Sequence, residues 1–362
     1  MPAGTVRRVT VIAGVRGVLP EHRYPQDEIT DMFAALLDDP ARARLARRLH
    51  GSAMVQTRHT VLPLDAYAGL DGFGGANDVF VENAVELGAT AILGALADAG
   101  LGPADVDAVF STTVTGVAAP SIEARIAGRI GLRPDVKRIP MFGLGCVAGA
   151  AGVARLHDYL RGDPDGVAVL LSVELCSLTL QRADDSTANL VASGLFGDGA
   201  SAVLAVGDRR AESVPRVSGP RVLDSRSHLY PGTQRTMGWD VTSTGLKIVL
   251  DANVPALARK YLGTDVREFL GAHQLSIGDV TAWACHPGGP KVIEAIEETL
   301  GLPGEALELT WRSLAAVGNL SSSSVLHVLR DTIEKHPPAG TPGVLMAMGP
   351  GFCSELVLLE WT

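Results

Sequence analysis

Cys146 is the residue whose surroundings most favour covalent chemistry. It lies in the small-residue stretch MFGLGCVAGAAG (141–152), which leads into the helical pattern GAAGVARLHDYL. A thiol near the first turn of a helix meets unpaired backbone N–H groups, and these stabilise the thiolate. The neighbouring glycines let a substrate approach the backbone closely. The stretch therefore predicts a nucleophilic cysteine, and the alternative is a small buried side chain in a tight turn.

Thiol catalysis needs a partner that exchanges protons or donates to developing negative charge. His286 ends the apolar run VTAWAC and begins HPGGPK, and ligands gather at the carboxyl ends of parallel strands. Asn319 lies in VGNLSSSSVLHVL, where a Ser-rich helix begins. Taken alone, His286 could be a core histidine and Asn319 a helix cap. The segment Gly349–Phe352 (GPGF) could likewise be only a tight turn.

Short apolar runs are expected to form the strands that position these residues. They are Val9–Ala13, Val106–Thr112, Val167–Leu175, Ala202–Val206, Val280–Cys285, Val344–Met348 and Leu356–Trp361. Continuous apolar runs bounded by turn residues suit a sheet covered on both faces. Helical patterns lie between them at Asn83–Ala99, Ser121–Ile130 and Val292–Leu300. The alternation predicts an α/β protein with largely parallel strands.

Two parts of the chain resemble each other. ADVDAVFSTT and GDVTAWACHP are offset by 174 residues, and the helices that follow them, ending EARIAGRIGL and IEAIEETLGL, by 170. VAVLLSVE echoes GVLMAMGP at an offset of 176. A near-constant offset indicates an internal duplication, although many strand–turn–helix units look alike. The polar segment Asp208–Ser227 is the expected linker, so we expect an N-terminal half at 1–208 and a C-terminal half at 219–362.

Composition excludes several classes of protein. The 362 residues are 46% hydrophobic and carry a net charge of −9, whereas a nucleic-acid binder normally has a basic surface. The cysteines are dispersed, form no CxxC pair and suit a reducing compartment. The N-terminus lacks a signal-peptide core, and no window approaches 18 uninterrupted apolar residues. The sequence therefore predicts a soluble, cytoplasmic protein with no membrane span and no nucleic-acid partner.

Together, these motifs resemble the type III polyketide synthases, the chalcone synthase-like group. GLGCVAG, CHPGGP, VGNLSSSS and a C-terminal GPG loop occur there in this order, and LFGDGAS (195–201) resembles a signature of the group. STTVTGVAAPSIEARI, SVELCSLTLQ and ASGLFGDGA are most similar to bacterial alkylresorcinol and alkylpyrone synthases. The resemblance covers essentially the whole chain. It implies a thiolase-like fold with duplicated α/β halves in a layered αβαβα arrangement, a homodimer, and no metal or prosthetic group.

The resemblance also implies a mechanism. Cys146 accepts an acyl group from a starter acyl-CoA as a thioester, and malonyl-CoA or methylmalonyl-CoA then loses carbon dioxide. His286 and Asn319 match the positions that stabilise the resulting enolate, and His286 matches the partner that keeps the cysteine ionised. The enolate attacks the acyl-enzyme. After several cycles the chain cyclises to an alkylresorcinol by aldol closure or to an alkyl-α-pyrone by lactonisation.

Further residues match positions that line the family's cavity. They are Thr115, Ala119, Cys176, Thr179, Phe196, Trp239, Ile248, Ser321, Gly349, Pro350 and Gly351. Ile248 stands where chalcone synthase has an aromatic gate, and Ala119 where plant enzymes have a larger methionine. Smaller side chains leave more volume for a substrate, and each buried methylene gains about 0.8 kcal/mol. We therefore expect a long-chain fatty acyl-CoA starter.

The CoA phosphates need a local basic surface on this acidic protein. The segment ARARLARRLH (41–50) carries four arginines on an expected helix, and Arg58 follows it. Arg44, Arg48 and Arg58 match the family's CoA-binding region, although the family's lysines are partly absent. The alternative is a solvated amphipathic face.

Two other functions remain open at this point. A β-ketoacyl carrier-protein synthase III-like enzyme shares the Cys, His and Asn residues but performs one condensation. Its His motif usually reads HQAN, whereas this chain has HPGGP and a GPG loop. The second alternative is an inactive acyl-CoA-binding homologue, and the joint presence of Cys146, His286 and Asn319 argues against it.

Overall fold

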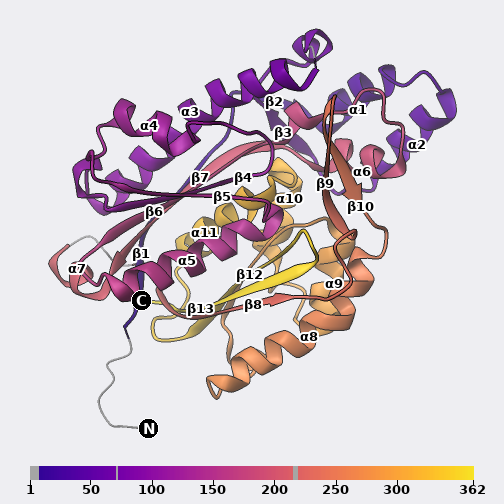
Figure 1. Ribbon diagram of the computed structural model, residues 1–362. Helices are drawn as coiled ribbons and strands as arrows, with labels where there is room; N and C mark the ends of the chain where they lie inside the picture. The colour runs from indigo at the N-terminus through magenta and orange to yellow at the C-terminus, as the bar shows by residue number, and fades with distance from the viewer. Residues whose placement is uncertain (1–7, 71, 215–218) are drawn as a thin grey trace.

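The computed structural model describes residues 8–70, 72–214 and 219–362, and its main feature is a nine-stranded sheet shared by two similar halves (Figure 1). The strand order is β11-β12-β13-β8-β1-β7-β6-β4-β5. The first half contributes β1 (Thr10–Val18), β4 (Ala108–Thr113), β5 (Lys137–Phe142), β6 (Val167–Leu175) and β7 (Asp198–Gly207). The second half contributes β8 (Arg221–Leu229), β11 (Ala282–Cys285), β12 (Pro342–Gly349) and β13 (Cys353–Glu360). The halves join where β1 and β8 pair at Thr10–Val222 and Val11–Arg221.

The sheet is mixed, which corrects the expectation of largely parallel strands. β4 runs parallel to β5 and β6, and β11 runs parallel to β12, but the other neighbouring strands are antiparallel. β12 and β13 are joined by the short turn at residues 350–352, and strands joined by such a turn run antiparallel. Apolar runs mark buried strands without marking their direction, so the sequence pattern could not predict this.

The two halves repeat the same order of elements. The matching helices are α3 (Gly72–Ala99) with α8 (Val254–Ala272), α4 (Ile122–Ile130) with α9 (Pro290–Leu300), and α5 (Ala148–Gly162) with α11 (Ser324–Glu334). Both α4 and α9 end at a left-handed glycine, Gly131 and Gly301. The strand orders β1-β7-β6-β4 and β8-β13-β12-β11 also correspond. The sequence repeat therefore reflects a duplicated α/β unit.

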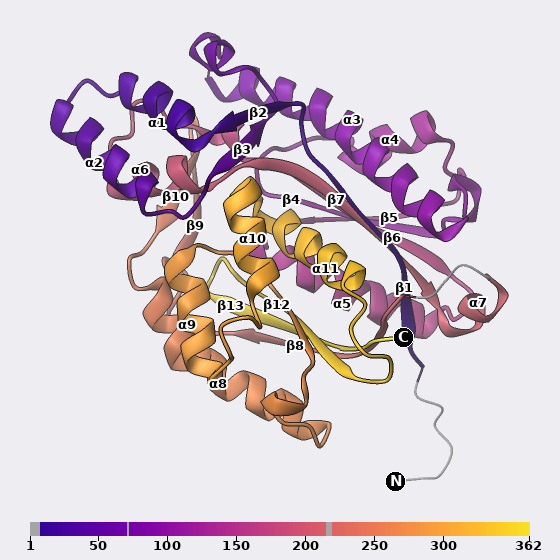
Figure 2. The same ribbon diagram turned by 180° about the vertical axis from the view of Figure 1, so that it is seen from behind.

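The elements stack in five layers (Figures 1 and 2). α3 and α4 cover the outer face of the first half of the sheet, and α8 and α9 cover that of the second half. α5 and α11 lie between the two half-sheets, where Leu156, Leu329 and Val357 belong to one buried cluster. Each helix layer buries apolar side chains against a strand face, which is the αβαβα arrangement of the thiolase-like fold.

Smaller elements gather at one end of the layers (Figure 2). They are α1 (Gln26–Ala35), α2 (Pro40–Gly51), α6 (Thr187–Leu195), the β2–β3 hairpin (His22–Pro25, Thr57–Thr60) and the β9–β10 hairpin (Met237–Thr242, Gly245–Leu250). Phe33, Ala46 and Leu190 form the small core between α1, α2 and α6. The remaining helices are α7 (Asp208–Ser213) and α10 (Glu308–Val317).

All strands and helices expected from the apolar patterns occur, with shifted ends. The largest shift is in α3, which begins at Gly72 rather than Asn83. α3 is the one helix of the described residues that is long and apolar enough to cross a membrane, with a mean hydropathy of 1.5. Its side chains Phe80, Ile92 and Leu96 are fully buried in the outer core. Its apolar composition is thus accounted for by packing inside the fold.

Candidate active site

Cys146 lies in the 3₁₀ turn Gly145–Val147 that leads directly into α5, as the sequence predicts. The turn lies against the segment that connects β12 to β13. A Cβ atom on Gly145 would lie 2.6 Å from Pro350 Cγ, and one on Gly349 would lie 2.7 Å from the backbone N of Val147. The GPG segment is therefore more than a tight turn, because its glycines permit close contact with the loop that holds Cys146.

His286 follows the last residue of β11 and continues the strand, since its backbone N–H donates to Met346 O at 2.9 Å. The residue is only 5% exposed, yet neither ring nitrogen has a hydrogen-bond partner. Buried polar atoms are nearly always satisfied, so an unpaired imidazole calls for an explanation such as a ligand. The placement at the carboxyl end of a strand matches the prediction.

Asn319 precedes α11 and is held by backbone contacts to the end of α6. Its N–H donates to Leu195 O at 2.9 Å, and its carbonyl accepts from Gly197 N at 3.0 Å. The side-chain Oδ1 accepts from Ser321 N at 2.8 Å, which fixes the amide orientation. The Nδ2 donor makes a long contact of 3.5 Å to Gly288 O, and the Asn319 side chain also hydrogen-bonds the Cys146 thiol, which lowers the pKa of that thiol. An oxyanion could therefore take this donor at little cost.

These three side chains line one cavity of about 480 Å³ at the junction of the two halves. Cys146 comes from the first half, and His286 and Asn319 from the second. The hydroxyl of Ser321 lies 3.8 Å from the Cys146 sulfur. The other predicted lining residues found here are Cys176, Phe196, Trp239, Ile248, Ser321 and Pro350. The arrangement combines a nucleophile, a base and an amide donor around one reaction space.

Burial determines the ionisation of the two reactive groups. It raises the pKa of the Cys146 thiol to about 12, and the nearby Glu174 carboxylate acts in the same direction. Burial lowers the pKa of His286 to about 3. The sequence predicts a thiolate at the helix N-terminus, and burial works against that prediction. Burial thus favours the neutral Cys146 thiol over the thiolate and the neutral His286 imidazole over the imidazolium, so acylation of Cys146 requires a base.

Glu174 is a fully buried carboxylate beside the nucleophile. Its Oε2 accepts hydrogen bonds from Val114 N and Thr115 Oγ1, both at 3.0 Å, and Ser322 donates to Oε1. Burial raises the pKa of Glu174, and these hydrogen bonds partly oppose that effect. Glu174 is not among the residues predicted from the motifs. A carboxylate at the end of a buried strand, as in VAVLLSVE, is the signal that marks it.

Trp239 and Ile248 form one wall of the cavity. They are cross-strand partners in the β9–β10 hairpin, so both side chains lie on the same face of it. Ile248 lines the cavity, and the Trp239 indole stands directly beside it. The space next to Ile248 is thus bordered by a larger side chain.

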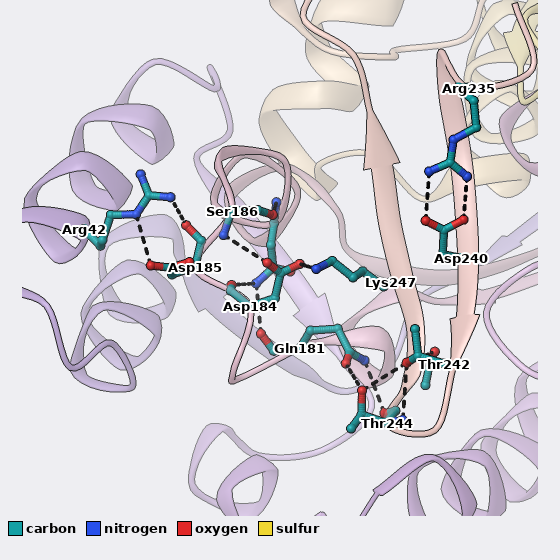
Figure 3. A network of polar contacts seen from close by, with 12 residues as sticks. Arg42, Gln181, Asp184, Asp185, Ser186, Arg235, Asp240, Thr242, Thr244 and Lys247 are labelled. Carbon is teal, nitrogen blue, oxygen red and sulfur yellow. Dashed lines mark hydrogen bonds and ion pairs between the residues drawn. The ribbon is translucent and has the colours of Figure 1, made fainter.

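The hairpin is tethered to the loop before α6 (Figure 3). Thr244 Oγ1 donates to Gln181 Oε1 at 2.9 Å, and Lys247 Nζ lies 3.5 Å from the Asp184 carboxylate. The Asp184 side chain is only 10% exposed, whereas the Lys247 side chain is 47% exposed, so water reaches the pair from the lysine side. These contacts hold the wall of the cavity in place.

Two smaller cavities lie beyond this wall. The first, of about 60 Å³, shares Cys176, Phe196, Trp239 and Ile248 with the main cavity. The second, of about 220 Å³, shares Tyr67, Ser177, Thr179 and Leu180 with the first. Thr179 lines both of these cavities, and Thr115 lines only the second. These two predicted lining residues thus border the smaller cavities rather than the main one.

Three predictions need correction. Gly349 and Gly351 are not on the cavity surface, where only Pro350 of that segment appears. Arg58 is 4% exposed and lies under α6, so it cannot meet a CoA phosphate at the surface. Sequence position alone does not show which atoms face a cavity. Ala119 is exposed and lines none of these cavities within one chain, so its role as a cavity residue stays a prediction.

The cavity opens beside the end of α2, where Leu49, Ser52 and Ala53 line it. Arg44 and Arg48 are exposed and four residues apart on α2, so they share one face. Lys291, in the first turn of α9, is exposed and lines the same cavity. Lys291 ends the motif HPGGPK, and its place after a Gly-Gly-Pro turn is the sequence signal that marks it. The three cations give the opening a local positive charge.

Comparisons with known proteins match nearly the whole chain. Models of the chalcone and stilbene synthases cover residues 5–209 (N-terminal domain) and 222–361 (C-terminal domain). A 1,3,6,8-tetrahydroxynaphthalene synthase of Streptomyces peucetius subsp. caesius is 54% identical over 359 residues, 98% of this chain and 94% of the relative.

Two further relatives extend this similarity. The alpha-pyrone synthesis polyketide synthase-like Pks18 of Mycobacterium tuberculosis is 30% identical, covering 99% of this chain and 93% of its own length. The crystal structure of 1,3,6,8-tetrahydroxynaphthalene synthase from Streptomyces coelicolor A3(2) is 30% identical. It superimposes with a TM-score of 0.91 over 97% of this chain and 99% of that chain.

Proposed function

Because this chain belongs to the chalcone and stilbene synthase family and is a type III polyketide synthase, we propose that malonyl-CoA is both its starter and its extender. The enzyme is an acyltransferase-type condensing enzyme, and the proposed product is a tetrahydroxynaphthalene. The observation that carries this proposal is the 54% identity, over nearly the full length of both chains, to a protein of that named activity.

The proposed mechanism follows from the cavity. His286 takes the proton of the Cys146 thiol, and the thiolate attacks the thioester of malonyl-CoA and releases CoA. A second malonyl-CoA then loses carbon dioxide, and the electron pair of the broken C–C bond becomes an enolate. The imidazole and the Asn319 amide donate to its oxygen. The enolate carbon attacks the acyl thioester and expels the thiolate, which accepts the extended chain again.

The product composition agrees with malonyl-CoA as the only substrate. A tetrahydroxynaphthalene has ten carbons, all in the rings, which equals five two-carbon units with no alkyl tail. Five malonyl-CoA molecules provide these units with loss of five carbon dioxide molecules, four from the extender units and the fifth from the carboxyl group of the starter after the last extension. One ring closure then breaks the thioester and expels the thiolate, and the other releases water, so the aromatic product forms without an oxidant.

The geometry of the cavity gives less support to the fatty acyl-CoA starter that the sequence predicts than to a compact starter. That prediction depends on Ala119 and Ile248, and Ala119 lies outside the cavity within one chain. Next to Ile248, the Trp239 indole stands between the main cavity and a chamber of only about 60 Å³. A compact starter fits this arrangement better than a long alkyl chain.

A fatty acyl-CoA starter giving an alkylpyrone or alkylresorcinol is the second candidate function. The two smaller cavities favour it, because they share residues with each other and with the main cavity and together extend away from Cys146. The relative named for alpha-pyrone synthesis also favours it. Movement of the β9–β10 hairpin would be needed to join the cavities into a channel.

The deciding experiment supplies purified enzyme with ¹³C-labelled malonyl-CoA alone, and in parallel with acyl-CoA starters of two to twenty carbons. Mass spectrometry of the extracts identifies the products. We expect a fully labelled ten-carbon aromatic product from malonyl-CoA alone. Products that form only with an acyl-CoA, and that retain its unlabelled alkyl chain, would support the second candidate and exclude the first.

We also infer that the enzyme is a homodimer. β5 pairs only with β4 among the described residues, which leaves one edge of the sheet open. Phe142 at the end of β5 is 58% exposed, and Val117 is also exposed. An open strand edge with apolar side chains is a typical surface for a second copy. Light scattering after gel filtration tests this inference, and a monomer mass would contradict it.

The cellular location is inferred from the cysteines. All four are free, and they are dispersed through the fold. Free thiols suit a reducing compartment, so we infer a cytoplasmic enzyme. Cell fractionation tests the location, and recovery outside the cytoplasmic fraction would contradict it.

A further inference from the structure

The chamber of about 60 Å³ beyond the Trp239–Ile248 wall contains an unusual buried cation. Arg58 lines it and is 4% exposed. Its Nε donates to Gln26 Oε1 at 3.0 Å, and its Nη1 donates to the carbonyls of Ser193 and Phe196 at 2.7 and 2.8 Å. All three acceptors are neutral. The third guanidinium nitrogen, Nη2, is buried and has no partner.

The charge of Arg58 persists in this environment. Burial lowers its pKa to about 10, which still leaves the guanidinium protonated at neutral pH. The nearest opposing charge is Asp198, which raises the pKa of Arg58. The Asp198 oxygens are occupied by Val61 N, Ser177 N and Ser177 Oγ. Asp198 therefore balances part of the charge but leaves Nη2 without an acceptor.

An unsatisfied buried guanidinium N–H is costly unless a ligand or water satisfies it. The chamber exceeds the roughly 10–15 Å³ that one water requires, so it has room for a small acceptor group. Other polar side chains line it as well, namely Thr60, Tyr67, Ser177, Asn189 and Ser193. The matching acceptor for a guanidinium is a carboxylate, which takes charge-assisted hydrogen bonds.

The chamber is adjacent to the nucleophile. Cys176 lines both the chamber and the main cavity. Phe196, Trp239 and Ile248 also line both cavities. A chain attached to Cys146 therefore reaches Arg58 past Cys176 when movement of the β9–β10 hairpin joins the main cavity to the chamber.

We propose that this chamber is a carboxylate subsite, in which Arg58 binds the free carboxylate at the far end of a malonyl-primed chain. The inference rests on the proposed function, because among the starters considered only malonyl-CoA leaves such a carboxylate. Each condensation moves this carboxylate two carbons away from Cys146. Binding it in the chamber keeps the growing chain extended and distinguishes a malonyl starter from an uncharged acyl starter of equal length.

The test uses a pair of probes that differ only in the terminal group. Glutaryl-CoA has the five acyl carbons of a malonyl-primed diketide and ends in a carboxylate, and valeryl-CoA has five carbons and ends in a methyl group. The full-length enzyme is incubated with each probe without malonyl-CoA, and the rate of Cys146 acylation is followed by intact-protein mass spectrometry. Because no product is formed, the result does not depend on the proposed product.

Two variants address the chamber in different ways. Arg58→Lys keeps a positive charge but lacks the second planar donor. Ala192→Leu fills the chamber, which Ala192 lines, and leaves Arg58 in place. Arg129→Lys is the matched control, since Arg129 forms an exposed ion pair with Glu86 away from the cavity. Thermal unfolding establishes that each variant is folded.

The expected result is a fall of about tenfold or more in the ratio of glutaryl to valeryl loading for both chamber variants, with the ratio of Arg129→Lys unchanged. A ratio within twofold of the wild-type value in Ala192→Leu would overturn the proposal, because the chamber would then hold only water. If Arg58→Lys does not fold, Ala192→Leu decides the outcome. Failure of the proposed function has a different signature, since the wild type would then make no aromatic product from malonyl-CoA alone.

Discussion

Replacement of His286 by alanine should slow the alkylation of Cys146 by iodoacetamide at neutral pH. Burial raises the pKa of the thiol to about 12, compared with an ordinary value of 9.0. At pH 7 a thiol of ordinary pKa is about 1% thiolate, and the buried thiol about a thousandfold less. Direct ionisation therefore supplies very little nucleophile, and reaction at pH 7 depends on a base within the cavity.

The pH dependence of Cys146 alkylation shows in which direction His286 changes the reaction rate. Burial lowers the pKa of His286 to about 3, so its imidazole is neutral from pH 6 to 10 but is by itself a weak base. Proton transfer from Cys146 must therefore be driven by the attraction between the imidazolium and the thiolate that it forms. In His286→Ala only direct ionisation remains, and its alkylation rate should rise about tenfold per pH unit. The wild type should react at least about tenfold faster at pH 7, and the difference should narrow towards pH 10.

The assay measures the alkylated Cys146 peptide by mass spectrometry, which separates it from the other cysteines. His336→Ala is the control, because His336 is an exposed histidine after α11. Equal rates for the wild type and His286→Ala at pH 7 would refute the reasoning. They would mean that the thiol ionises without the imidazole, for instance through the N-terminus of α5 alone.

Three further changes have defined outcomes. Cys146→Ala should lower product formation by at least about a thousandfold in an end-point assay while leaving the unfolding temperature near the wild-type value, since the change removes the nucleophile. Trp239→Ala should join the main cavity to the small chamber and raise kcat/KM for acyl-CoA starters by about fourfold per added methylene, until the space is filled; an unchanged chain-length profile would contradict this. Gly349→Ala should cost about 1–3 kcal/mol of unfolding free energy and lower kcat, because its Cβ would lie 2.7 Å from Val147 N. Gly128→Ala is the control, because a Cβ atom added to Gly128 in α4 would have no other atom within 4 Å. Its free energy of unfolding, measured with urea, should equal or exceed the wild-type value.

Periodicity and motif order predicted much of the fold and the three reactive residues. Buried strands such as Val167–Leu175 carry continuous apolar runs, and the repeat offsets indicated the duplication. Cys146, His286 and Asn319 each lie at the end of an element that such patterns mark. The family match along both halves also disfavours the single-condensation alternative.

What the patterns did not predict depends on three-dimensional packing. β8 and the β9–β10 hairpin have mixed burial, so no apolar run marks them. Arg58 looks like a surface cation in sequence, because an arginine's burial depends on what covers it, here α6. Ala119 matches a cavity position of the family yet is exposed within one chain. In each case the deciding contacts are made by residues far away in the sequence.

The duplicated helices α5 and α11 place different residues at equivalent positions. The 3₁₀ turn before α5 carries Cys146, and the turn before α11 begins directly after Asn319 and Leu320. The residue equivalent to Cys146 in the second copy is Ser322, the middle residue of the turn Ser321–Ser323, and Asn319 lies just before that turn. The first copy thus carries the nucleophile, and the second carries the amide donor at a different position of the same junction. The duplicated scaffold is therefore an asymmetric catalyst, in which neither half contains the complete chemistry.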